Sequence, residues 1–248
     1  MAFDPESFIE RQVGLLRNEI GNEKAFAATS GGVDSTVSAM LAHKAIGKRA
    51  LVAFLDDGLM REGEPEDVVG KLKGMGLNAR LYRVQEPFFR ALKGLTDPEE
   101  KRKAFRRTFY DTLTGIAKEE GAKYFIQGTI AADVVETKGG VKTQHNVLDQ
   151  IGIETSKEYG FRFLEPLVEL YKPEVRKVGV KLGLPADMYQ RRAFPGPGLS
   201  LRVIGEVTPE RVAVVRKATK IIEEGTSDLS SFQAFAVLLS DKATGVEG

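Results

Sequence analysis

The sequence predicts an α/β protein in which helices cover both faces of a mostly parallel, twisted sheet of about five strands. Short apolar runs alternate with segments of helical periodicity, which is typical of β-α-β units. Polar segments containing glycine follow three of these runs directly. The composition, with 42% apolar and 29% charged residues, is that of a globular protein, and 248 residues suffice for one large domain with an appendage.

The expected helices and strands alternate along the chain. Residues 6–20 have apolar side chains at helical spacing and predict an opening helix. A second helix is expected to end near residue 46, and a third to span residues 66–75. Pro98 begins a long charged helix, which Gly121 ends. The strands are expected at residues 24–29, 50–55, 79–84, 123–128 and 161–164.

Residues 30–36, Ser-Gly-Gly-Val-Asp-Ser-Thr, lie between the first expected strand and the next helix. Glycines let backbone N–H groups approach an anion, and a helix N-terminus adds unpaired donors and a favourable dipole. The heptad therefore predicts a phosphate cradle, and because a bare carboxylate repels phosphate, Asp34 indicates a bridging Mg²⁺. The G-x-x-x-x-G-K-[ST] spacing is absent, which disfavours a Walker-type kinase or GTPase. The alternative is a turn in which Ser30 or Asp34 only caps a helix.

Charge and cysteine usage exclude several classes of function. Lys+Arg 36 against Asp+Glu 35 gives a formal net charge of +1, so no nucleic-acid partner is expected. The apolar runs are short and the N-terminus lacks the pattern of a signal peptide, so we expect no membrane and a cytoplasmic location. Without cysteine the chain has no disulfide, thiolate zinc site or cysteine nucleophile. Any ammonia that it uses must come from another polypeptide or from solution.

Ligands of parallel α/β sheets bind beyond the carboxyl ends of the strands. This rule is expected to bring residues 30–36, 56–61 and 128–136 to one edge of the sheet. The pattern weakens at residues 137–158, which predicts either a mobile lid or an ordinary surface loop.

A Pro-Gly segment at residues 193–198 is expected to end the catalytic domain, which we place at residues 1–198. Beyond it, Thr208 caps a helix, and the apolar run at residues 232–239 predicts a strand. One helix with one or two strands makes a poor core, so residues 199–248 are interpreted as the start of an incomplete α+β module.

The motifs, taken in order, resemble GMP synthetase, and the resemblance covers essentially the whole chain. The segment at residues 30–35 is similar to the PP-loop of the N-type ATP pyrophosphatases, which have an adenine nucleotide α-hydrolase-like fold. The organisation resembles the archaeal type, in which the ATP pyrophosphatase and the glutamine amidotransferase are separate polypeptides. The other matching segments are residues 55–61, 127–137, 141–147, 165–172 and 194–208.

The resemblance implies a ligase that uses ATP and Mg²⁺. The 2-oxygen of xanthosine 5′-monophosphate (XMP) attacks the α-phosphorus of ATP, pyrophosphate leaves, and ammonia from the amidotransferase partner displaces AMP to give GMP. It implies catalytic roles for Asp34, Ser35 and Lys142, with Asp34 on the metal. The implied ATP-binding residues are Ser30, Gly31, Gly32, Val33, Asp34, Ser35, Thr36 and Gly128, and the implied XMP-binding residues are Arg61, Asp133, Glu136 and His145.

Each of these roles has a structural alternative. Arg61 is otherwise a surface arginine and His145 a structural histidine, whereas Asp56, Asp57, Asp133 and Glu136 are otherwise turn or helix-start residues. Arg191, Arg192 and Arg202 flank the Pro-Gly segment, and one of them is expected to contact either a substrate phosphate or another domain or subunit.

The chain also departs from the family's pattern. The family commonly has Asn, Pro and His where Asp57, Ala132 and Gln144 stand. Its C-terminal dimerisation module closes with a K-P-P-x-T-I-E segment, which has no counterpart before Gly248. We therefore expect a truncated module: ATP and Mg²⁺ binding survive, whereas XMP binding, homodimer formation and turnover are weakened.

Two other functions stay open at this point. NAD synthetase shares the PP-loop but not the Phe-Pro-Gly-Pro-Gly segment. A non-catalytic adenine-nucleotide sensor of the universal-stress type would bind ATP without releasing pyrophosphate.

Overall fold

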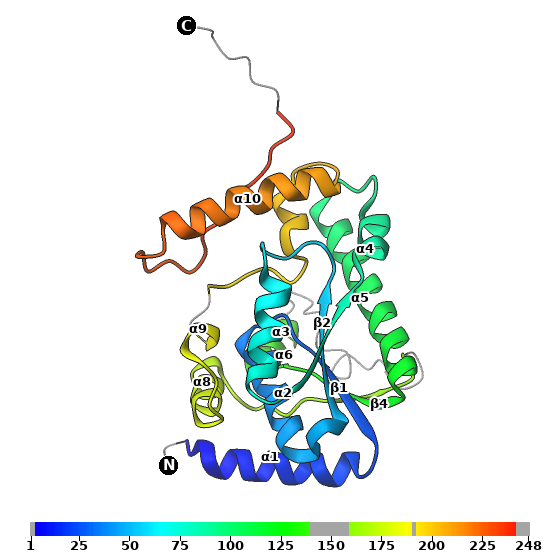
Figure 1. Ribbon diagram of the computed structural model, residues 1–248, viewed down its shortest axis with the longest axis vertical. Helices are drawn as coiled ribbons and strands as arrows, with labels where there is room; N and C mark the ends of the chain where they lie inside the picture. The colour runs from blue at the N-terminus through cyan, green and yellow to red at the C-terminus, as the bar shows by residue number, and fades with distance from the viewer. Residues whose placement is uncertain (1–2, 139–158, 190–191, 242–248) are drawn as a thin grey trace, which may run out of the picture. The chain divides into compact units, whose positions relative to one another are not determined.

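The computed structural model describes residues 3–138, 159–189 and 192–241, which form two compact units (Figure 1). Unit 1 consists of Met1–Leu55, Pro65–Tyr82 and Tyr110–Arg191, and unit 2 of Asp56–Glu64, Arg83–Phe109 and Arg192–Gly248. Unit 2 thus combines the C-terminal segment with two earlier ones. The domain boundary at residue 198 stays a prediction.

A five-stranded sheet in the order β3-β2-β1-β4-β5 organises unit 1. Strand β1 pairs in parallel with β2 and with β4, and β4 pairs in parallel with β5. All seven residues of β2 are buried, as expected for the interior of a layered α/β fold. The predicted fold class is confirmed, and each strand lies within two residues of its predicted position. The strands are β1 (Lys24–Ala28), β2 (Ala50–Asp56), β3 (Asn78–Arg83), β4 (Ala122–Ile126) and β5 (Arg162–Leu164).

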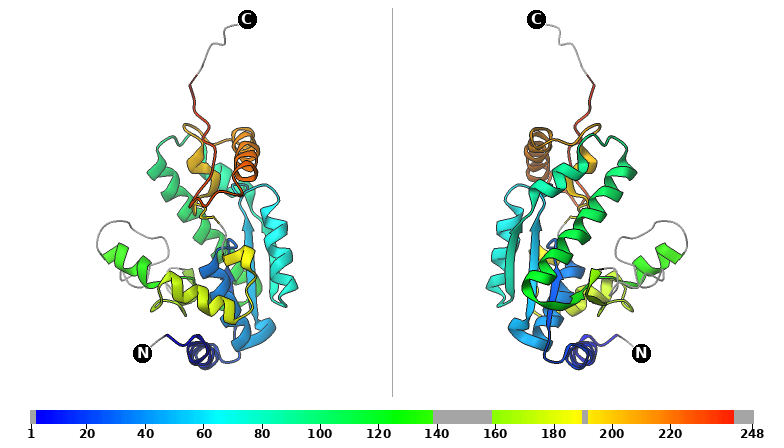
Figure 2. Two further views of the ribbon diagram at one scale, coloured as in Figure 1. Left: turned by 90° about the vertical axis from the view of Figure 1, so that its left-hand side faces the viewer. Right: turned by 90° about the vertical axis from the view of Figure 1, so that its right-hand side faces the viewer.

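Helices cover both faces of the sheet. Figure 2 shows α3 and the C-terminal part of α5 on opposite sides of β2. Helices α1, α2 and α8 pack against one another. Asp4 caps α1 by accepting from the amides of Glu6 and Ser7. The helices that belong wholly or partly to unit 1 are α1 (Pro5–Ile20), α2 (Val33–Ile46), α3 (Glu64–Gly74), α5 (Pro98–Glu120), α6 (Ala131–Lys138), α8 (Lys172–Lys181) and α9 (Ala186–Tyr189).

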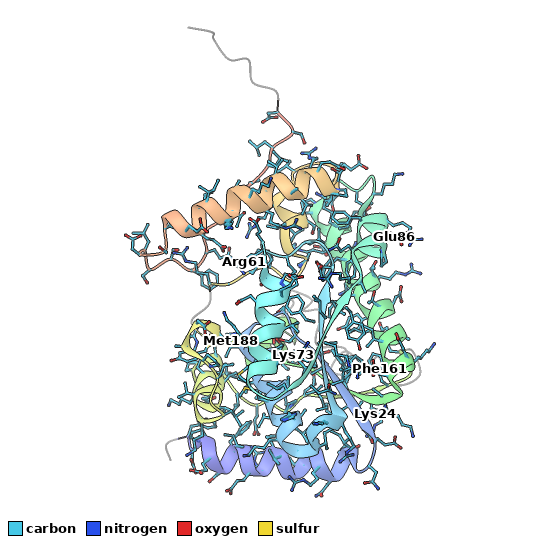
Figure 3. All side chains as sticks on the ribbon, in the orientation of Figure 1. Lys24, Arg61, Lys73, Glu86, Phe161 and Met188 are labelled. Carbon is cyan, nitrogen blue, oxygen red and sulfur yellow. The ribbon has the colours of Figure 1, made fainter. Side chains whose placement is uncertain are left out.

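Three phenylalanines on or beside neighbouring strands form the centre of the core in unit 1. The ring centroid of Phe26 lies 4.8 Å from that of Phe125 and 5.2 Å, edge to face, from that of Phe161, which Figure 3 labels. Such pairs stabilise by about 0.5–1.5 kcal/mol beyond their area burial. Because β1 and β4 are parallel neighbours, the segments that follow them leave the same edge of the sheet.

Unit 2 has a hydrophobic core of its own. Helices α4 (Gln85–Leu92) and α10 (Pro209–Gly225) and the 3₁₀ turn η3 (Gly198–Arg202) contribute to it. Gly198, with φ of 58°, lies so close to Leu59 that a Cβ would be 2.4 Å from the Leu59 carbonyl oxygen. The fully buried residues of this hydrophobic core are Leu59, Phe88, Leu92, Leu199 and Val212.

The predicted strand at residues 232–239 is wrong. This segment makes a single parallel bridge, between Leu238 and Val203, and residues 201–202 belong to the 3₁₀ turn. Phe232 is 81% exposed and Leu239 57% exposed. An apolar run becomes a strand only where a neighbouring strand pairs with it. Among the described residues, only one bridge pair forms with this segment.

In the described part of the chain, no helix combines the length and the apolar composition that crossing a membrane demands.

Candidate active site

The loop between β1 and α2 is held together by the hydroxyl of Thr29. This buried oxygen accepts from the Gly31 amide at 3.1 Å and lies 3.1 Å from Ser35 Oγ and 3.3 Å from Thr36 Oγ1. Gly31 has φ of 75°, a conformation that glycine adopts without strain. The hydroxyl of the fully buried Thr36 therefore faces the loop interior, whereas Ser30 is exposed.

The N-terminus of α2 lacks a side-chain cap. Its N-cap residue is Gly32, in extended conformation, and no side chain among the described residues makes a capping hydrogen bond to it. Unpaired amides and the positive end of the helix dipole make such a terminus an anion site. The alternative in which Ser30 or Asp34 caps the helix is thereby contradicted.

Gly128, two residues beyond β4, packs against the first turn of α2. A Cβ at this position would lie 2.7 Å from the Ser35 amide nitrogen and 2.9 Å from the Asp34 carbonyl carbon. Real Cβ atoms do not approach backbone so closely, so only glycine fits here. The predicted meeting of residues 30–36 and 128–136 is therefore observed. Residues 56–61, the third predicted segment, belong to unit 2.

Asp34 lies in the first turn of α2 with its side chain 25% exposed. One carboxylate oxygen, Oδ2, accepts from Lys172 Nζ, whereas Oδ1 is buried and has no hydrogen-bond partner among the described residues. Burial raises the pKa of Asp34, the Lys172 ammonium opposes the rise, and the Asp133 carboxylate adds to it.

The donor set around Asp34 fits Mg²⁺. This ion is usually held by one or two carboxylates together with substrate phosphates and water. The partnerless Oδ1 supplies one such oxygen, and Asp133 places a second carboxylate close enough to affect the pKa of Asp34. Within the described residues there is no cluster of three or more His, Asp or Glu side chains that could hold a metal alone.

The other predicted residues of unit 1 lie on or beyond α6. Asp133 Oδ2 accepts from the Ile130 amide at 3.0 Å, so this carboxylate also caps its own helix. Glu136 lies on the same helix. Lys142 and His145 lie outside the described residues.

Lys172, the first residue of α8, has no role predicted from the sequence. Its ammonium contacts Asp34, and Arg176, one turn later, contributes a further positive charge that lowers the pKa of Asp34. A signal for Lys172 was present in the sequence. Proline is common at the first position of a helix, so Pro173 marks a possible helix start, where a lysine is disfavoured by the helix dipole and needs another reason.

In unit 2, Asp56 and Asp57 satisfy the turn that follows β2. Asp56 Oδ1 accepts from the Gly58 amide at 3.1 Å and Oδ2 from Gln85 Nε2 at 2.8 Å. Asp57, only 2% exposed, accepts from the Leu59 amide at 2.8 Å. Burial raises the pKa of Asp57 to about 7. These contacts support the turn-capping interpretation for both residues.

Arg61, which Figure 3 labels, also has structural partners within unit 2. Its Nε donates to Glu223 Oε1 at 2.8 Å, and its guanidinium lies 4.2 Å from the ring centroid of Phe194. Arg192 donates to the carbonyls of Thr226 and Leu229. The guanidinium of Arg202 lies over the ring of Phe235, at 3.4 Å from its centroid, and Arg191 lies outside the described residues.

The fold and this loop define an α/β protein with a glycine loop and an uncapped helix N-terminus at the carboxyl edge of a parallel sheet. A solved structure shares the fold: NMN synthetase from Francisella tularensis superposes with a TM-score of 0.61 over 90% of this chain and 87% of its own, at 18% identity. No family model matches the chain.

The sequence relatives are more specific. A subunit of glutamine-hydrolysing GMP synthase from Archaeoglobus fulgidus is 50% identical over 246 residues, or 99% of this chain and 78% of its own length. The subunits of the same name from Thermococcus kodakarensis and Sulfurisphaera tokodaii are each 49% identical over 98% of this chain, which covers 78% and 65% of their respective lengths. The chain belongs to this family of GMP synthase subunits, and the family predicted from its motifs is confirmed.

Proposed function

We propose that the chain is the ATP pyrophosphatase subunit of a glutamine-dependent GMP synthase. In the proposed reaction, the 2-oxygen of XMP attacks the α-phosphorus of ATP, the bond to the β-phosphate breaks, and pyrophosphate leaves. Ammonia then displaces AMP from the adenylated base to give GMP. The observation that carries the proposal is the uncapped N-terminus of α2 beside a buried, partnerless oxygen of Asp34, in a chain 50% identical to a named GMP synthase subunit.

The cradle acts by position and charge. Amides of the first turn of α2, with the hydroxyls of Ser30 and Ser35, would bind the phosphate oxygens that gain charge as pyrophosphate departs. Asp34 would hold Mg²⁺, whose charge would offset that of the phosphates. Gly128 keeps the segment after β4 close enough to Ser35 to close one side of the cradle. No covalent enzyme intermediate is required.

Ammonia is proposed to come from a separate glutamine amidotransferase subunit. The chain has no cysteine with which to hydrolyse glutamine in the manner of a cysteine amidotransferase, and its relatives are named as one subunit of a glutamine-hydrolysing enzyme. A homodimer, the absence of nucleic-acid binding and a cytoplasmic location stay predictions.

Pyrophosphate release tests the proposal. The purified chain is supplied with ATP, Mg²⁺ and ammonium, together with XMP, deamido-NAD or no acceptor. We expect pyrophosphate only with XMP, in a 1:1 ratio with GMP. Release that depends on deamido-NAD would overturn the proposal in favour of NAD synthesis. ATP binding without release under any acceptor would favour a nucleotide sensor. Replacing ammonium by glutamine with the amidotransferase subunit tests the partner.

A further inference from the structure

One face of α10 holds the loop that follows β2. Arg216, Lys220 and Glu223 follow one another at helical spacing, so their side chains lie on the same face of this helix. The Lys220 ammonium lies 3.6 Å from Glu62 Oε2, and Glu223 accepts from Arg61 at 2.8 Å. The helix face and the loop both belong to unit 2, so these contacts lie within one unit.

Arg216 binds the backbone of this loop at two points. Its Nε donates to the Met60 carbonyl at 2.9 Å, and its Nη2 donates to the Gly58 carbonyl. The guanidinium is planar and its donors are fixed in direction, so it can hold two carbonyls in one arrangement. A lysine ammonium, a compact charge on a flexible stem, would not fix the two carbonyls in this way.

The peptide group between Met60 and Arg61 is bound at both ends. Its carbonyl accepts from Arg216, and its N–H donates to Oε2 of the buried Glu64 at 2.8 Å. Because a peptide group is planar, these two bonds restrict its rotation. They therefore set the direction in which the Arg61 side chain leaves the backbone.

The turn that precedes this peptide group has hydrogen bonds of its own. The side chains of Asp56 and Asp57 each accept from an amide two residues later, and the Leu59 carbonyl accepts from the Leu199 amide at 2.8 Å. One of the two carbonyls that Arg216 binds lies beyond these contacts. A need for turn stability alone therefore explains less of the arrangement than a need to place the next side chain.

We propose that Arg216 is a positioning residue for the nucleotide acceptor: it fixes the peptide group before Arg61 and so presents the Arg61 guanidinium to XMP. Nη1 of Arg61 lies 3.7 Å from Glu64 Oε1 and has no hydrogen-bond partner among the described residues, so one donor of this guanidinium is unused. Arg216 itself touches no substrate. This inference rests on the proposed function, in which XMP is the acceptor, and adds a residue to it.

Two affinities of Arg216→Met test the proposal without turnover. We expect the Kd for XMP, measured by titration calorimetry, to rise at least about fivefold, because Arg61 loses its fixed direction. The Kd for ATP should stay parental, since the cradle proposed to bind it belongs to unit 1. Partial unfolding would lower the number of competent sites in both titrations instead. Lys217→Met, at the next and exposed position of α10, is the matched control and should change neither Kd.

A double-mutant cycle tests whether Arg216 acts through Arg61. If it does, adding Arg216→Met to Arg61→Met should raise the Kd for XMP little further. Additive increases would mean that Arg216 acts on XMP independently and would overturn the proposal. A parental Kd for XMP in Arg216→Met, or equal rises for XMP and ATP, would also overturn it. Arg216→Lys keeps the charge without the fork and is expected to give an intermediate Kd, which provides a second variant if the methionine protein does not fold.

Amide hydrogen exchange separates this inference from the choice of acceptor. Exchange at residues 58–62 should become at least about tenfold faster in Arg216→Met, and unchanged exchange would overturn the proposal whatever the acceptor is. If exchange accelerates but XMP supports no pyrophosphate release, Arg216 still positions the loop and the proposed acceptor is wrong. If XMP supports release and Arg216→Met binds XMP as the parent does, only this inference is wrong.

Discussion

Gly128 lies against the backbone of Ser35, and a Cβ on Gly128 would be 2.7 Å from the Ser35 amide nitrogen. This contact brings the segment after β4 to the first turn of α2, where neither backbone has room for a methyl group. The φ of Gly128 is not positive, so its backbone conformation does not require glycine. The close contact with Ser35 is what requires it. The cradle therefore depends on close backbone packing as well as on the residues that point into it.

Gly128→Ala is expected to force the two segments apart. Overpacking of this kind costs about 1–3 kcal/mol of unfolding free energy, and a shift of the α2 amides should lower XMP-dependent pyrophosphate release at least about tenfold. Chemical denaturation and the pyrophosphate assay measure the two effects. Gly70→Ala is the control, since a Cβ there meets nothing within 4 Å. Parental activity in Gly128→Ala would show that the close contact does not position the cradle.

Asp34→Asn removes the carboxylate that is proposed to hold Mg²⁺ while keeping its size. Loss of one preorganised electrostatic group typically lowers the rate by about 10²–10³-fold, and we expect a decrease of this order in XMP-dependent pyrophosphate release. The folded protein should persist, because burial already disfavours the charged form of Asp34. Asp67→Asn, at an exposed position on α3, is the control. An undiminished rate in Asp34→Asn would contradict the assigned role.

Local features of the site could be predicted from the sequence, whereas its long-range contacts could not. The strand, the glycine turn and the helix start at residues 24–36 are set by neighbouring residues, and the structure has them at the predicted positions. Lys172 contacts Asp34 across 138 positions of sequence, and Arg61 contacts Glu223 across 162. Which side chains meet over such separations depends on how the elements pack. The run at residues 232–239 was mispredicted for the same reason, since strand formation depends on a neighbouring strand.

Asp57 should make the stability of the protein depend on pH. Its pKa is about 7 in the folded chain, against the ordinary value of 3.8 that we take for the unfolded chain. Between these values the folded state holds a proton that the unfolded state has released, so stability falls as pH rises through this window and levels off above about 7. The difference of about 3 pKa units corresponds to at most about 4 kcal/mol.

Asp57→Asn is expected to remove this dependence. The amide oxygen can still accept from the Leu59 amide, and no charge is buried at high pH. The variant should therefore be more stable than the parent at about pH 8, and the difference should shrink towards about pH 5, as measured by urea denaturation. Asp228→Asn, an exposed position of the same unit, should leave the profile unchanged. A parental pH profile in Asp57→Asn would mean that another group titrates.

Arg61 stabilises unit 2 through Glu223 and the ring of Phe194, whatever it contacts in the substrate complex. Its side chain is 13% exposed and that of Glu223 22%, so the pair is largely desolvated and the loss of either charge should be felt. Glu223→Gln and Arg61→Met are each expected to lower the unfolding free energy by about 1–3 kcal/mol, since either change leaves a buried charge with weaker partners. Denaturation of both variants measures this effect, and the KM for XMP separates it from substrate binding.

A KM that rises in Arg61→Met but not in Glu223→Gln would identify a contact between Arg61 and the nucleotide. Equal KM values, with equal losses of stability, would confine the residue to the packing of its own unit.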